Sequence, residues 1–163
     1  SKPVSPSSEL GVVAEIEWKG ATWRAAYGDL SVKELLTILK GFGPMEILEF
    51  ERPGRVRGQV SLSLSAKGQK QITLYYLEVL GERRRGRGRE ALEWLRGIFK
   101  GELYVEDPGI IHVKNPNAES LLFWIAMYRE GLIQAMESEF CILRPGMREK
   151  ELTEIEKKLV EVR

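Results

Sequence analysis

The chain has 163 residues, 43% of them hydrophobic and 30% charged, with a net charge of +1, a balance typical of a folded domain and unlike that of a disordered or fibrous chain. The near-neutral charge excludes binding of nucleic acid through bulk charge alone. One cysteine and one histidine exclude an internal disulfide and a Cys/His zinc site, no apolar run is long enough for a membrane span, and a cytoplasmic location is expected.

The first forty residues predict a tail, a hairpin and a helix. Residues 1–10 begin with a Ser/Pro-rich run that is typical of a disordered tail. Alternating apolar and polar residues predict a strand over 12–18 and, after the turn signal at 19–20, a returning strand over 21–27. Ser31 and Glu34 have the spacing of a capping box, so we expect a helix from Ser31 to the glycines at 41 and 43.

Three strands are then expected, over 45–52, 56–66 and 71–80, separated by turn signals at 53–54 and 67–68. The third is apolar on both faces, which predicts a central strand covered on both sides. A Gly/Arg loop leads from it into a helix over 88–100. A short strand over 103–106 and a turn over 107–109 follow.

Asn115 and Pro116 suit the first positions of a further helix, which Gly131 ends. Two closing strands, over 132–136 and 140–143, and a charged helix over 147–163 complete the chain. These elements predict a mixed α/β fold: a central, mostly antiparallel sheet with helices on both faces. We expect one domain over 11–146, with the helix over 147–163 packed on it.

The segment that carries chemistry is the Gly/Arg loop between the central strand and its helix. A helix start has backbone N–H groups without intrahelical partners and a positive dipole end. Gly86 and Gly88 let an anion approach the backbone, and the arginines at 83, 84, 85, 87 and 89 add positive charge. This pattern predicts a phosphate-binding turn. A solvated basic turn and contact with nucleic-acid phosphates are the alternatives, and the near-neutral net charge disfavours the second.

Two stretches of the chain resemble the signatures of the GCN5-related N-acetyltransferases. Arg83-Arg84-Arg85-Gly86-Arg87-Gly88 is similar to the Arg/Gln-x-x-Gly-x-Gly/Ala motif of that family, and it lies between strand and helix as it does there. Asn115-Pro116-Asn117-Ala118, followed by Phe123-Trp124 and Gly131-Leu132, is similar to the second motif. The order of predicted elements also suits the fold of the family.

The resemblance implies that acetyl-coenzyme A is the co-substrate and that no metal is needed. Loop amides of residues 84–88 would hold its pyrophosphate. Its pantetheine arm would lie in a gap between the strands at 71–80 and 103–106, pair with the strand backbone and meet the second motif. The implied cofactor-binding residues are Val79, Leu80, Arg83, Arg84, Arg85, Gly86, Arg87, Gly88, Asn115 and Phe123.

The implied reaction is direct transfer of the acetyl group to a primary amine, with one base and one acid. Glu78 is the candidate base, and an ordinary strand residue facing solvent or an arginine is the alternative. Tyr128 is the candidate acid, and core packing is the alternative because the interval from Asn115 to Gly131 is longer than in the family. The identity of the acceptor amine and the formation of a homodimer stay open. The alternative function is a non-catalytic acyl-coenzyme A-binding or nucleic-acid-contacting module of the same fold.

Overall fold

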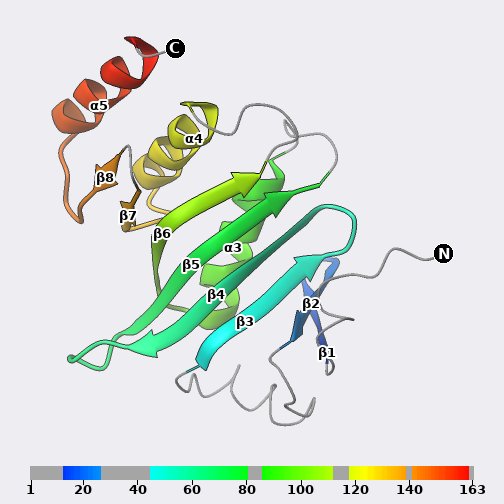
Figure 1. Ribbon diagram of the computed structural model, residues 1–163. Coiled ribbons are helices and arrows are strands. Elements are labelled where there is room, and N and C mark those ends of the chain that lie inside the picture. Colours follow the sequence, from blue (N-terminus) through cyan, green and yellow to red (C-terminus); the bar gives the residue numbers. More distant parts are fainter. Residues whose placement is uncertain (1–12, 27–44, 81–85, 112–117, 139–140, 162–163) are drawn as a thin grey trace.

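The computed structural model describes residues 13–26, 45–80, 86–111, 118–138 and 141–161, and these form one mixed sheet with helices beside it (Figure 1). The strands are β1 (Val13–Trp18), β2 (Ala21–Ala26), β3 (Met45–Arg52), β4 (Val56–Leu64), β5 (Lys70–Val79), β6 (Glu102–Ile111), β7 (Ala135–Glu137) and β8 (Ile142–Leu143). The described helices are α3 (Arg87–Phe99), α4 (Ala118–Arg129) and α5 (Glu149–Glu161).

The eight strands lie in the sheet in chain order. β1 to β5 form an antiparallel meander, β6 and β7 each run parallel to the preceding strand, and β8 returns antiparallel. α3 makes the crossover from β5 to its parallel neighbour, as a parallel pair requires. The mixed, mostly antiparallel sheet expected from the sequence is confirmed.

The core lies between α3 and one face of the sheet (Figure 1). Its largest cluster is aromatic: Trp94 of α3 stacks on Trp23 of β2 at 4.7 Å between ring centroids and meets Phe99 edge to face at 5.9 Å. Phe50 of β3 completes this cluster. Burying these rings supplies much of the apolar stabilisation that holds the β1–β2 hairpin to α3.

A β-bulge in β5 decides which side chains face away from α3. Gln59 of β4 lies opposite Tyr76 and Val60 lies opposite Leu74, so Tyr75 has no opposing residue. Before the bulge Leu74 is buried, and after it Leu77 is buried, so the inward positions change from even to odd numbers. The bulge thereby turns Tyr76 and Glu78 to the face opposite α3.

That opposite face is polar and, over β3 to β6, no described helix covers it (Figure 1). Tyr75 is 37% exposed. The prediction that the strand at 71–80 is covered on both sides is therefore wrong at Tyr75, and helices on both faces are not found among the described residues. The physical reason is that the outward positions of β5 carry Thr73, Tyr76 and Glu78. The polar atoms of these side chains tolerate contact with water, so this face of the strand needs no cover.

Most predicted bounds are confirmed within a few residues, but two stretches differ. β6 continues to Ile111, whereas the sequence predicts a strand over 103–106 and a turn over 107–109. Pro108, which has no N–H to donate, lies where the register between β5 and β6 shifts. The strand therefore continues through the predicted turn, with an irregularity in its pairing. β7 begins at Ala135, later than the predicted 132. The predicted tail at 1–10 and the predicted helix from Ser31 lie outside the described residues.

Candidate functional site

Gly86 directly precedes α3 and adopts the left-handed conformation, with φ 67° and ψ 19°, and no side chain caps the helix. The first α-helical hydrogen bond runs from the Glu90 N–H to the Gly86 carbonyl at 3.0 Å. The N–H groups of Arg87 and Gly88 precede it, at the positive end of the helix dipole. The start of α3 thus has the backbone geometry that the phosphate-binding prediction requires.

Arg87 folds back from the first turn of α3 toward the end of β5. Its Nη1 donates to the Leu80 carbonyl, and its Nε is buried without a hydrogen-bond partner in the described part of the chain. The Leu80 N–H donates to the Arg55 carbonyl at 2.8 Å. The backbone of Leu80, a predicted contact of the pantetheine arm, is therefore already hydrogen-bonded on both sides.

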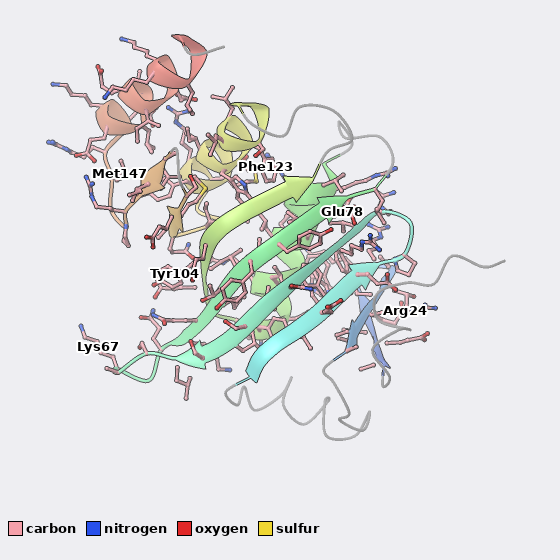
Figure 2. The ribbon with its side chains drawn as sticks, in the orientation of Figure 1. Arg24, Lys67, Glu78, Tyr104, Phe123 and Met147 are labelled. Atoms are coloured by element: carbon pink, nitrogen blue, oxygen red, sulfur yellow. The ribbon has the colours of Figure 1, made fainter. Side chains whose placement is uncertain are left out.

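Gly88 and Phe123, which come from the two motifs of the resemblance, are in contact. Gly88 is buried, and a Cβ built on it would lie 2.9 Å from Cζ of Phe123. A side chain at position 88 would thus push away the Phe123 ring, which also packs against Trp124 at 5.0 Å. The absence of a side chain at position 88 lets α4 approach the start of α3 (Figure 2, where Phe123 is labelled).

Glu78 lies near the carboxyl end of β5, on the sheet face turned toward the viewer in Figure 2. Arg57, directly opposite on β4, donates from Nε to the Glu78 carboxylate. Tyr76 lies on the same face, two residues earlier. Its pKa is raised above the ordinary 10.0, first because the hydroxyl is partly buried and then because it is hydrogen-bonded to the Glu78 carboxylate. These three side chains form what we call the β5 cluster: Arg57, Tyr76 and Glu78.

Pairing with β6 leaves no gap beside β5 up to Glu78, the last β5 residue with a described partner in β6. β5 and β6 stay paired from Gln71 and Glu102 up to Glu78 and Ile111. Across the register shift, Tyr75 of β5 faces three residues of β6, Glu106 to Pro108, and pairing resumes at Tyr76 and Gly109. The pairing leaves no gap for a pantetheine arm between Tyr76 and Glu78, whereas the chain beyond Ile111, beside Val79 and Leu80, lies outside the described residues.

Tyr128 belongs to a different part of the molecule. Its hydroxyl donates to the Arg144 carbonyl and accepts from the Met147 N–H at 2.8 Å. It therefore holds the connection between β8 and α5. Beside it, Arg129 pairs with Glu149 and Glu156 of α5, so the end of α4 anchors the last helix.

Of the other predicted residues, Val79 ends β5 opposite Val56. Arg83, Arg84, Arg85 and Asn115 lie outside the described residues. The sequence alone does not point to Arg57 and Tyr76. Pairing of the predicted strands at 56–66 and 71–80 across the turn at 67–68 would bring both residues close to Glu78. The register of that pairing can be set only when the bulge at Tyr75 is known.

No family model, curated protein or solved structure matches this chain. Among the described residues, no group of His, Cys, Asp and Glu side chains is arranged to hold a metal ion. No helix in the same part of the chain has the length and apolarity needed to cross a membrane.

The β5 cluster predicts a late tyrosine titration. Because the pKa of Tyr76 is raised on folding, the unfolded chain releases this proton first. Stability is then full below pH 10 and falls as the pH rises through the raised value. Burial also raises the pKa of Tyr104, so a tyrosinate absorbance titration should show a late step to which two tyrosines contribute. Tyr76→Phe should remove the share of Tyr76, and Glu78→Gln should move that share toward the ordinary pKa.

Tyr75→Phe is the matched control, because it removes the neighbouring tyrosine at the bulge and leaves the β5 cluster intact. The late step should persist in that variant. If Tyr76 titrates at its ordinary pKa in the native chain, the cluster does not form as described.

Proposed function

We propose that the chain is an N-acetyltransferase that takes an acetyl group from acetyl-coenzyme A and transfers it to a primary amine, with the acyltransferase domain over 11–146. The observation that carries the proposal is the start of α3: a left-handed glycine directly before the helix, in the first part of the crossover that follows the last strand of the meander. The two sequence motifs that meet at Gly88 and Phe123 support it.

The proposed contact with coenzyme A is at its diphosphate. The N–H groups that open α3 supply backbone donors, and the unpartnered Nε of Arg87 supplies a buried cationic donor beside them. A buried N–H without an acceptor is unfavourable, so an anion that reaches Arg87 gains from completing its hydrogen bonds. These groups fit a diphosphate. The paired β5 and β6 do not fit an arm between them, so we assign no path for the arm.

Acetyl-coenzyme A would supply the thioester: the amine nitrogen attacks its carbonyl carbon, the C–N bond forms, the C–S bond breaks, and the sulfur leaves as the thiol. Glu78 is the proposed acceptor of the amine proton. Arg57 fixes the orientation of its carboxylate. The Tyr76 hydroxyl is protonated at neutral pH, as an ordinary tyrosine is, and lies on the same face as Glu78. It is the proposed proton donor in place of Tyr128, whose hydroxyl is bonded to the connection before α5.

A second candidate function is binding of an acyl-coenzyme A without turnover. The specific observation that favours it is the closed β5–β6 ladder, which reaches Ile111 opposite Glu78. The Arg57 contact adds to this, because it occupies the carboxylate that a base would need. In that case the α3 start holds the nucleotide part and no amine is acetylated.

Calorimetry with acetyl-coenzyme A, followed by thiol release with a panel of amines, separates the two. Binding with thiol release supports the transferase, and loss of release in Glu78→Gln with binding retained assigns the base. Glu49→Gln is the matched control, since Glu49 lies on the same face and accepts from Gln59 at 2.8 Å. Binding without release for any amine supports the second candidate. Absence of heat and of a thermal shift at millimolar ligand overturns both.

A further inference from the structure

Three hydrogen bonds close a ring in the connection from β8 to α5. The Tyr128 hydroxyl donates to the Arg144 carbonyl and accepts from the Met147 N–H at 2.8 Å. The third bond uses a sulfur atom: the Arg144 N–H donates to Sδ of Met147 at 3.1 Å. A thioether sulfur is a weak acceptor. The geometry of this connection therefore depends on the chemical state of one methionine side chain.

Met147 is also the most accessible of the three methionines whose side chains the structure describes (Figure 2). Met127 is 4% exposed and Met136 2%, and both lie in the core. Met147 is partly exposed, and its neighbours in the connection, residues 144–146 and 148, are exposed. Because the oxidation of a methionine follows the access of solvent to its sulfur, a dissolved oxidant reaches Met147 before the other two.

Addition of one oxygen atom to Sδ of Met147 is incompatible with this ring. The sulfur and the Arg144 nitrogen are 3.1 Å apart, and an N–H···O bond alone needs about 2.9 Å. An oxygen on the lone pair that accepts from Arg144 therefore has no room, and the connection must open to admit it. An oxygen on the other lone pair makes the side chain polar where it packs against the core. Either product weakens the attachment of the connection.

α5 has few other attachments to the rest of the molecule. Leu152 is the one α5 side chain that is fully buried among those the structure describes. Arg129 of α4 pairs with Glu149 and Glu156, but ion pairs in contact with water contribute little. An element with so little buried surface opens more readily than the core does. Loss of the ring at Met147 is therefore expected to release α5 before it disturbs the sheet.

We propose that Met147 is a site of reversible oxidation and that its sulfoxide weakens the docking of α5. Hydrogen peroxide is the oxidant. A lone pair of Sδ attacks one peroxide oxygen, the S–O bond forms, the O–O bond breaks, and the departing hydroxide takes the proton of the transferred oxygen and leaves as water. A thiol-dependent reductase reverses the step: the sulfoxide oxygen leaves as water while two thiols become a disulfide. The site is independent of the proposed acetyl transfer, which uses the start of α3 and the outer face of β5.

Peroxide treatment of the full chain, followed by mass spectrometry of its peptides, measures the oxidation rate of each methionine. We expect Met147 to form its sulfoxide about tenfold faster than Met127 and Met136, because the core encloses those two. The chain unfolded in denaturant is the control: the three rates should then become equal, since burial is the cause of the difference.

Limited digestion with trypsin measures the docking of α5, since cleavage after Arg148 or Lys150 requires the start of this helix to open. The oxidised chain should be cut there about fivefold faster, the effect of losing one hydrogen bond. Treatment with a methionine sulfoxide reductase should restore the slow rate. Met147→Gln, which places a polar side chain of similar length at this position, should be cut faster without peroxide.

Met147→Leu is the matched control, since leucine packs like methionine but has no sulfur to oxidise. Peroxide should leave the cleavage rate of this variant at its own untreated value. Met136→Leu, a similar replacement in β7, should keep the full effect of peroxide, because it leaves Met147 in place.

Equal oxidation rates for the three methionines in the folded chain overturn the proposal, because Met147 is then no more accessible than the core. A cleavage rate that does not change when Met147 is oxidised shows that the sulfoxide does not act on α5, and this too overturns it. The same acceleration in Met147→Leu assigns the effect to another residue, with the same consequence. None of these readouts needs acetyl-coenzyme A, so failure of the transferase proposal leaves them unaffected.

Discussion

Replacing Gly58 by alanine is expected to destabilise the fold by about 3 kcal/mol, because the added methyl group has no space in the packed core. Gly58 faces the core from β4, and a Cβ there would lie 2.4 Å from the backbone oxygen of Tyr76 and 2.7 Å from Cζ of Phe50. Phe50 cannot swing aside, because it is 1% exposed and packs against Trp94. The carbonyl of Tyr76 belongs to the β5 bulge, so relief requires moving the strand.

Chemical denaturation with a thermal melt measures this effect, and a fall of about 6–12 °C in Tm corresponds to it for a chain of this size. Gly97→Ala in α3 is the matched control. Its Cβ would meet only side-chain atoms of Trp18, the nearest at 3.0 Å, and alanine also favours the helix. We expect the control to be close to neutral. An equally mild effect at Gly58 would contradict the described packing of β4 against the bulge.

The same bulge explains why the face of Glu78 could not be predicted from the sequence. In a regular strand, Glu78 would share the inward face with Ile72 and Leu74, which are both buried. One extra residue at Tyr75 reverses the alternation, so that Leu77 and Val79 point inward instead. Because the run from Leu74 to Leu77 has apolar or aromatic side chains at both sets of alternating positions, the sequence gives no sign of where the reversal occurs.

Local signals predicted the elements well because each acts over a few residues. Gly54 with φ 78° follows Pro53 in the turn after β3, and Gly68 with φ 77° ends the turn before β5, as the turn chemistry requires. Long-range pairing was not accessible in this way. Pro108 reads locally as a turn, yet pairing with β5 keeps the strand going through it.

In the candidate site, too, local features were predicted from the sequence and long-range contacts were not. A helix start at the Gly/Arg loop was predicted from the sequence, whereas the left-handed conformation of Gly86 is a finding of the structure. The partner of Glu78 could not be predicted from the sequence, since Arg57 lies on another strand and meets Glu78 only through the β4–β5 register. The contact between Gly88 and Phe123 depends on how α4 approaches α3, which no local pattern encodes.

Replacing Gly86 by glutamate is expected to lower the affinity for acetyl-coenzyme A by about a hundredfold or more while the fold survives. A Cβ at Gly86 has nothing within 4 Å, so the side chain fits without displacing a neighbour. The positive φ of 67° costs about 1 kcal/mol for a residue with a side chain, a fall of about 2–4 °C in Tm. The carboxylate then lies beside the N–H groups at the start of α3, where it repels a diphosphate and competes for the same donors.

Two controls separate the charge at this position from the cost of the backbone conformation. Gly86→Asn places a neutral side chain that tolerates the left-handed region, and it should keep most of the affinity. Gly146→Glu puts the same charge on a glycine with φ 78° and equally open surroundings, in the turn before α5, and it should leave acetyl-coenzyme A binding unchanged. If Gly86→Glu binds acetyl-coenzyme A as tightly as the native chain, the ligand does not contact the start of α3. The backbone donors there then serve the helix alone, and the transferase proposal loses the observation on which it depends.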